Sequence, residues 1–187
     1  AVDAGRPTFA LTERQTVAAG AMFSCALAQG QVFCWGKNDV GQCGDASGAD
    51  HPVPMRVMPI ADAIEISAGQ NHACALTSVG QVWCWGGNEL GQLGRGTQAL
   101  TGAPTLVPGL SGVQSIAVGS QGHNCALRTG GQLWCWGRGL GNTGTGSASP
   151  FPVTGLGAVT AVSVGDHQVC AVLPQGALWC WGGNYAG

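Results

Sequence analysis

Short apolar runs, separated by turns rich in glycine and proline, follow one another along the whole chain. Between residues 51 and 85 these runs read HPVPMRV, AIEISAG, CAL and QVWCW. Runs of this length, bounded by turn residues and rich in β-branched and aromatic side chains, predict β-strands rather than helices. The CAL and QVWCW runs are joined by a short glycine-containing turn, which predicts an antiparallel hairpin. The pattern therefore indicates an all-β chain.

The same order of runs occurs four times. The string Cys-Trp-Gly begins at residues 34, 84, 135 and 180, and a CAL or CAV run precedes each by nine or ten residues. A period of roughly 50 residues marks a repeat architecture in which each unit is one supersecondary element. Four units with four strands each are predicted, with approximate bounds of 6–50, 51–102, 103–148 and 149–187.

Eight of the nine cysteines stand at the two matching positions of the hairpin. Pairing Cys74 with Cys84 also places Leu76 opposite Val82. Opposed residues on antiparallel strands have Cα atoms about 4.5 to 5.5 Å apart, which suits a disulfide. One bridge per unit is expected, with unbridged core cysteines as the alternative. The pairs are Cys25 with Cys34, Cys74 with Cys84, Cys125 with Cys135, and Cys170 with Cys180.

The ninth cysteine, Cys43, lies in GQCG, where the next unit reads GQLG with Leu93. A buried free thiol in place of a leucine is one interpretation, because an unpaired cysteine packs as a small apolar residue. An intermolecular bridge is the other.

The QVWCW run is apolar on both of its faces. Val82 and Cys84 point to one side, and Trp83 and Trp85 point to the other. A small sheet whose two faces are both covered by copies of itself is a propeller blade. The tryptophans are therefore predicted to pack between blades, with an exposed aromatic binding platform as the alternative.

Residues 68–94, AGQNHACALTSVGQVWCWGGNELGQLG, resemble the repeat of the regulator of chromosome condensation family, and the resemblance covers nearly the whole chain. It implies a β-propeller of four-stranded blades, usually seven, so the four repeats would form part of a seven-bladed ring. The paired cysteines resemble the secreted bacterial members. Known members include an exchange factor for a small GTPase that also binds chromatin, and a bacterial inhibitor that clamps another protein with its propeller face.

The composition argues against several partners. Only 9% of the 187 residues are charged, the net charge is −2, and Lys37 is the single lysine, so no basic surface for nucleic acid is expected. No apolar run reaches the roughly 18 residues that a membrane span needs.

Candidate chemistry is sparse. No Cys-x-x-Cys pair exists, and we expect neither a metal nor a cofactor. The histidines are expected to hydrogen-bond in turns at one end of the ring (His51, His72, His123 and His167). Residues 139–144 fit Gly-x-Gly-x-x-Gly, but no helix follows, so they are interpreted as a turn. Because the carboxylates are scattered, no enzyme activity is expected.

The loops after each GQxG turn differ in length and content, which makes them candidate binding loops. Structural tolerance explains the same variation equally well. The residues singled out are Asp45, Ser47, Asp50, Arg95, Thr97, Gln98, Thr145 and Ser147.

Disulfides form in oxidising compartments, so an extracellular, cell-surface or periplasmic location is expected. The predicted role is non-catalytic binding or assembly, with another protein or copies of itself as the partner. Two alternatives from other classes are a nuclear or cytosolic regulator of a small GTPase, and a secreted lectin or enzyme with a site at the propeller channel.

Overall fold

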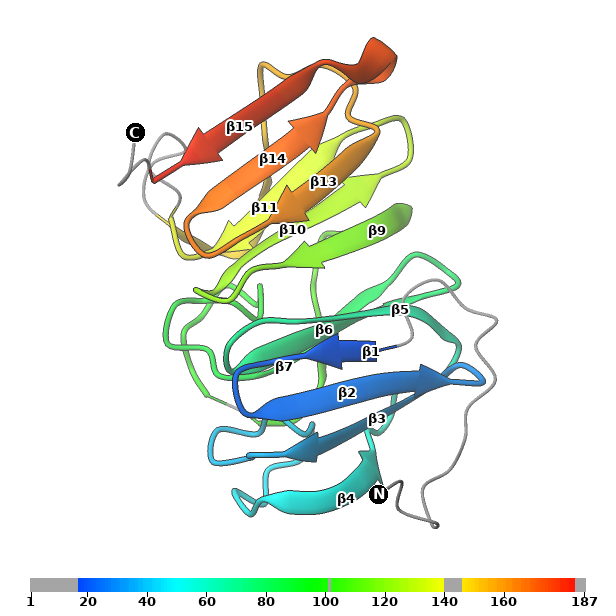
Figure 1. Ribbon diagram of the computed structural model, residues 1–187, viewed down its shortest axis with the longest axis vertical. Helices are drawn as coiled ribbons and strands as arrows, with labels where there is room; N and C mark the ends of the chain where they lie inside the picture. Colours follow the sequence, from blue (N-terminus) through cyan, green and yellow to red (C-terminus); the bar gives the residue numbers. More distant parts are fainter. Residues whose placement is uncertain (1–16, 101, 140–145, 184–187) are drawn as a thin grey trace, which may run out of the picture.

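The computed structural model describes residues 17–100, 102–139 and 146–183 and contains four antiparallel sheets. The sheets, here called blades 1 to 4, follow one another along the long axis of the molecule (Figure 1). Blade 1 holds β1 (Val17–Ala19), β2 (Phe23–Ala28), β3 (Gln31–Gly36) and β4 (His51–Arg56). Blade 2 holds β5 (Ala63–Ala68), β6 (His72–Thr77), β7 (Val82–Gly86) and β8 (Thr105–Leu106). Blade 3 holds β9 (Val113–Val118), β10 (His123–Arg128), β11 (Leu133–Gly137) and β12 (Ser147–Pro152). Blade 4 holds β13 (Ala161–Val164), β14 (Gln168–Val172) and β15 (Leu178–Gly182), with a 3-10 turn at Pro174–Gly176.

The hairpin register is the predicted one, and it carries the disulfides. Cys74 lies opposite Cys84 and Leu76 opposite Val82, and the same relation holds in the other three blades. All four bridges are present, each with Cα atoms 4.1 Å apart. Cys43 is free and buried, like Leu93 at the matching position.

The outermost strand of each of blades 1 to 3 comes from the following sequence repeat. The proline-led run at residues 51–56 forms β4 and pairs with β3, and β8 and β12 pair with the preceding strand in the same way. The blades are therefore offset by one strand from the repeat bounds of 51–102 and 103–148. The reason is that the loop after the third strand of each blade reverses the chain direction. The next run therefore pairs antiparallel with that third strand.

The prolines of these outer strands cost no ladder hydrogen bonds. Val57 N–H donates to the carbonyl of Val32 across the sheet. Because N–H directions alternate along a strand, the position three residues earlier faces away from β3, and Pro54 occupies it. Pro104 and Pro150 hold the same position relative to Val107 and Val153.

Neighbouring blades pack a cysteine face against a tryptophan face. In the first junction, Cys25, Leu27 and Val32 of blade 1 share a buried cluster with Ile66 and Trp85 of blade 2. Trp136 and Trp181 repeat this packing in the next two junctions. The prediction that these tryptophans pack between blades is confirmed.

The inner strands β1, β5, β9 and β13 lie next to one another, and repeated glycines let their ends approach closely. A Cβ atom added to Gly69 would lie 2.5 Å from the carbonyl oxygen of Gly119, and one added to Gly119 would lie 2.6 Å from that of Gly165. Both distances are shorter than any normal contact, so a side chain has no room there.

This crowding predicts that Gly119→Ala lowers the free energy of unfolding by about 1–3 kcal/mol, the usual cost of overpacking. Gly165 is the matched control, because it holds the same repeat position and its added Cβ would meet nothing closer than 3.8 Å. Gly165→Ala should therefore be tolerated. Equal losses for the two variants in urea titrations would contradict this explanation.

Candidate functional site

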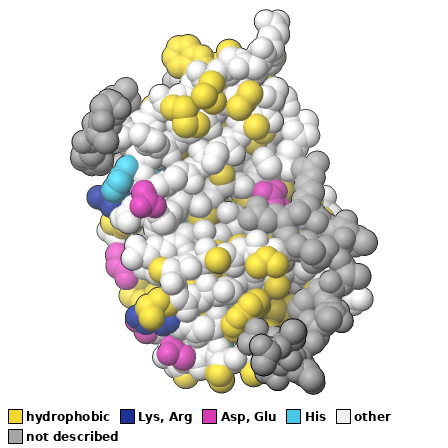
Figure 2. Space-filling model, viewed as in Figure 1, with side chains coloured by type: hydrophobic (Ala, Val, Ile, Leu, Met, Phe, Trp, Pro, Cys, Tyr) yellow, Lys and Arg dark blue, Asp and Glu magenta, His cyan; other side chains and the backbone are white. Residues whose placement is uncertain are grey.

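One end of the propeller collects most of the charge, and we call it the turn face. It consists of the turns between the first two strands of each blade and of the loops that follow the third strand. Figure 2 shows charged side chains along its edge, on the left of the view. Eight of the twelve charged residues that the structure describes lie here: Lys37, Asp39, Asp45, Asp50, Glu89, Arg95, Arg138 and Asp166.

Three hollows lie side by side on the turn face. The largest, about 420 Å³, lies where the inner strands meet and is lined in part by Gln70, Ser120 and Asp166. Two others of about 270 and 250 Å³ extend outward over the loops of blades 1 and 2. Gln70 lines all three hollows, and together we call them the trough.

The residues that line this trough are not among those predicted from the sequence. Gln70, Ser120 and Asp166 each directly follow the repeated glycine at the end of an inner strand. In the sequence these positions show only as a residue that differs from repeat to repeat after a glycine present in all four repeats. Its meaning depends on how blades are arranged around the axis, which local pattern does not show.

The first insert loop is folded around a buried asparagine. The side-chain amide of Asn38 donates to Asp45 Oδ1, Ser47 Oγ and the carbonyl of Ala49. Asn38 N–H donates to Asp50 Oδ1 at 2.9 Å. Although partial burial opposes it, hydrogen bonds from Asn38 and Ser47 lower the pKa of Asp45. The carboxylates predicted to bind a partner are thus partly engaged within their own loop.

The second insert loop repeats this plan. Asn88 donates to the carbonyls of Thr97 and Ala99, and Arg95 donates to that of Ala99 at 2.6 Å. Gln98 is exposed. Ser147, which was predicted in the third loop, is the first residue of β12 and donates its Oγ–H to the carbonyl of Ser149, while Thr145 lies outside the described residues. The described candidate residues therefore take part in hydrogen bonds within their loops or are exposed, and none of them lines the three hollows.

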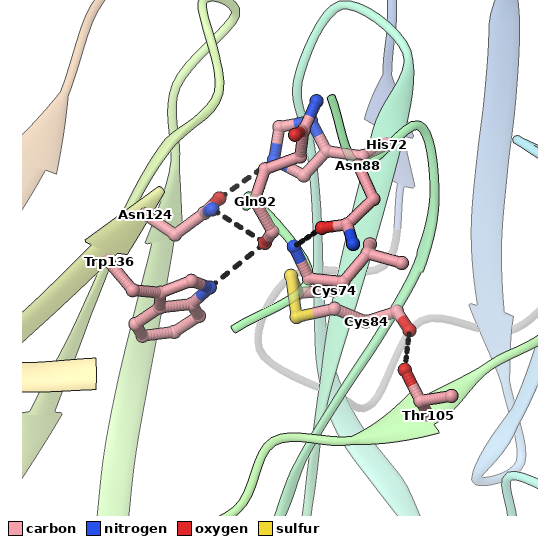
Figure 3. Close-up of a disulfide and its surroundings, with 9 residues drawn as sticks. His72, Cys74, Cys84, Asn88, Gln92, Thr105, Asn124 and Trp136 are labelled. Carbon is pink, nitrogen blue, oxygen red and sulfur yellow. Dashed lines mark hydrogen bonds between the residues drawn. A yellow bond between two sulfur atoms is a disulfide. The ribbon is translucent and has the colours of Figure 1, made fainter. Parts of the chain in front are cut away.

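A buried polar network joins blades 2 and 3 beneath the turn face (Figure 3). His72 Nε2–H donates to Asn124 Oδ1 at 2.8 Å, and Asn124 Nδ2 donates to the carbonyl of Gln92. Trp136 Nε1 donates to that same carbonyl. Burial, with a smaller effect of nearby His123, lowers the pKa of His72 to about 4, although the hydrogen bond to Asn124 opposes the shift. His72 is neutral and structural.

His123 holds the matching position in the next junction. Its Nε2 lies 2.7 Å from the carbonyl oxygen of Asp166 and its Nδ1 3.0 Å from that of Arg138. His51 lies 2.9 Å from Asp45 Oδ2, and the His167 ring centre is 6.4 Å from that of His123. His51, His72 and His123 thus take part in hydrogen bonds at one end of the propeller, as predicted.

One free thiol, Cys43, lies among the described residues. Within the described ranges, no group of three or more His, Cys, Asp or Glu side chains is arranged to hold a metal ion. Burial, together with the nearby Asp45 and Asp50, raises the pKa of the Cys43 thiol to about 11. Among the residues with described positions, no helix is long and apolar enough to cross a bilayer.

Known proteins share both the repeat and the architecture. The Regulator of chromosome condensation (RCC1) repeat model matches residues 29–76 and 79–127, which is more than half of the chain. A second model of the same repeat matches residues 63–92. The RCC1 domain-containing protein RUG3, mitochondrial, of Arabidopsis thaliana is 30% identical over 127 residues, covering 65% of this chain and 28% of that protein.

Two solved propellers superpose well. Human WBSCR16 gives a TM-score of 0.79 at 25% identity over 89% of this chain, and Prp20p from Saccharomyces cerevisiae gives 0.77 at 26% identity over 94%. Prp20p has been described together with its binding properties to Gsp1p and histones. The chain spans 46% and 47% of these two proteins, respectively. It belongs to the regulator of chromosome condensation (RCC1) repeat family and has that family's β-propeller fold.

Proposed function

We propose that this chain is a non-catalytic protein-binding module that acts in an extracellular, cell-surface or periplasmic compartment. The observation that carries the binding role is the turn face, which holds the trough of three hollows and eight of the twelve charged residues that the structure describes. Loops held on a rigid scaffold are where recognition usually takes place. The binding of Gsp1p by Prp20p supports a protein as the partner.

The binding role is tested with a pair of glutamine variants. Gln70→Arg places a large charged side chain in all three hollows, and Gln81→Arg makes the same change on the exposed hairpin turn at the opposite end. The immobilised variants are exposed to the extracellular fraction of the source organism. The amount of protein retained by Gln70→Arg should be at least tenfold lower than the amount retained by the parent chain or by Gln81→Arg. Equal retention by both variants would place the binding surface elsewhere.

The compartment rests on the four disulfides, since the cytosol keeps thiols reduced. The protein is isolated from its source, unfolded without reductant, alkylated and weighed. One modified thiol, Cys43, is expected. Labelling of eight or nine cysteines would contradict the proposed compartment, although it would not test the binding role.

Regulation of a small GTPase is the second candidate, because Prp20p, at 26% identity, binds Gsp1p. The disulfides weigh against it, since disulfides are rare in cytosolic and nuclear proteins, where thiols are kept reduced. A nucleotide-release assay with a fluorescent guanine nucleotide separates the two candidates. We expect no acceleration by this chain, and acceleration that Gln70→Arg abolishes would favour the exchange role instead.

A further inference from the structure

Two of the three hollows repeat one plan in neighbouring blades. The first hollow, of about 270 Å³, lies between the loop after the third strand of blade 1 and the first turn of blade 2. The second hollow, of about 250 Å³, lies at the matching place between blades 2 and 3. Gln70 and Asn71 line both hollows, so the two are direct neighbours.

Each hollow is lined by an acidic residue followed by an aliphatic one. These pairs are Asp39–Val40 in the first hollow and Glu89–Leu90 in the second, and they hold equivalent positions of the first two repeats. In both loops the N–H of the aliphatic residue donates to the side chain of a glutamine two positions later, at 3.0 Å to Gln42 and 2.8 Å to Gln92. Because the loops share this hydrogen bond, they present their carboxylates in equivalent places.

In the first hollow the carboxylate is paired within the chain. Lys37 Nζ lies 2.9 Å from Asp39 Oδ2. Gln42 Nε2 donates to Asp39 Oδ1 at 2.8 Å. The first hollow therefore holds a complete pair of an ammonium group and a carboxylate.

The second hollow keeps the carboxylate but lacks the base. Gly87 stands where the first repeat has Lys37, and Glu89 forms no ion pair with another described residue. Gln92 Nε2 donates to Asn71 Oδ1 at 3.5 Å, so the glutamine amide is directed to the shared wall of the hollows. The Glu89 side chain is exposed and open to a ligand from solution.

Arg138 holds the position of Lys37 in the third repeat, and its guanidinium is engaged elsewhere. Its Nη1 donates to Gln121 Oε1 at 3.0 Å. Gln121 lines the second hollow, but no ion pair joins Arg138 to Glu89 among the described residues. The carboxylate of the second hollow is thus left for a base from outside the chain.

We propose that the second hollow binds an arginine or lysine side chain of the partner protein, which completes the pair that Lys37 completes in the first hollow. This inference rests on the proposed function, because the hollow is part of the trough. Opposite charges attract more strongly where a hollow excludes part of the surrounding water. Leu90 is 40% exposed in the same hollow, so apolar residues beside the basic one would also find a contact.

NMR titration of the isotope-labelled chain with two acetylated and amidated peptides tests the site. One peptide is Ala-Leu-Arg-Leu-Ala, and the other carries citrulline in place of arginine, which keeps the size of the side chain and removes its charge. The arginine peptide should shift the backbone amides of Glu89 and Leu90 and bind about three- to fivefold more tightly, as expected for an exposed ion pair. Equal binding of the two peptides by the parent chain would overturn the proposal.

Two variants assign this preference to one carboxylate. Glu89→Gln should reduce the ratio of the two affinities to about one. Asp62→Asn is the matched control, because it removes a carboxylate at the opposite end of the propeller and should leave the ratio unchanged. The amide spectrum of each variant shows at the same time whether the chain is folded. The same loss of preference in both variants would mean that Glu89 does not hold the arginine.

Lys37→Ala tests the equivalence of the two hollows. Removal of this ammonium group leaves Asp39 in the situation of Glu89, so the arginine peptide should now also shift the amides of Asp39 and Val40. These amides should not respond in the parent chain. If no new shift appears, or if Arg138→Gln raises the charge preference because Arg138 already serves Glu89, the proposed pairing is wrong.

The peptide experiment and the capture experiment can fail independently. If Gln70→Arg lowers protein retention while the two peptides bind equally, the turn face remains the binding surface and only the basic side chain of the partner is rejected. If the peptides differ as expected while Gln70→Arg and Gln81→Arg retain equal amounts, the basic site is supported and the proposed binding surface is rejected.

Discussion

Trp85→Ala is expected to lower the free energy of unfolding by about 3–5 kcal/mol, the usual cost of removing a buried aromatic ring. Trp85 is 0% exposed and fills the junction between blades 1 and 2. Its Nε1 also donates to the carbonyl of Gln42 at 2.9 Å, which would lose this partner. Urea unfolding with the disulfides intact measures the loss.

Trp179→Ala provides the control for this variant, because Trp179 is 54% exposed at the open end of blade 4. A cost below about 1 kcal/mol is expected for an exposed residue. Similar losses for the two variants would mean that the blades are not held together by their tryptophan faces.

His72 should make the protein sensitive to acid. Its folded pKa of about 4 lies below the ordinary value of 6.5, because burial disfavours the charged ring. Below pH 6.5 the His72 ring binds a proton in the unfolded chain but not in the folded one. The free energy of unfolding therefore falls as the pH drops. The loss is complete below about pH 4 and amounts to about 3 kcal/mol.

The variant His72→Gln isolates this effect. Glutamine does not titrate, it can donate to Asn124, and Gln168 already holds the matching position in blade 4. The difference in unfolding free energy between parent and variant, measured at pH 7.5 and 4, should shift by about 3 kcal/mol in favour of the variant. Parallel pH profiles for the two proteins would show that His72 does not titrate as described.

Local pattern was enough to predict the hairpins, the register of Cys74 with Cys84, and the burial of Trp85 between blades. These features depend on residues about ten positions apart or on alternation along one strand. The hydrogen bond between His72 and Asn124 joins residues 52 positions apart, and the trough at Gln70 forms only where inner strands meet. Such contacts depend on blade rotation, which alternation of apolar and polar residues does not encode.

The assignment of the outer strand shows the same limit. The run at residues 51–56 stands at the start of a sequence repeat, but its hydrogen bonds go to the preceding blade. Likewise, Asp45 and Asp50 are polar residues in a variable loop, a pattern typical of recognition. Asp45 accepts a hydrogen bond from the buried side chain of Asn38, and Asp50 accepts one from the backbone N–H of Asn38, contacts that the local pattern does not show. In both cases the sequence pattern identifies the residue but does not show which group it hydrogen-bonds to.

The offset between sheets and repeats also bears on how the molecule responds to pulling. Each of the first three sheets ends in a strand whose chain continues directly into the next blade. A force that peels β8 from β7 therefore also loads β9, and a blade loses its outer strand once the following repeat is drawn away. Neighbour coupling of this kind favours collective rupture over stepwise release, so a stretched chain is expected to unravel in few large events rather than one blade at a time.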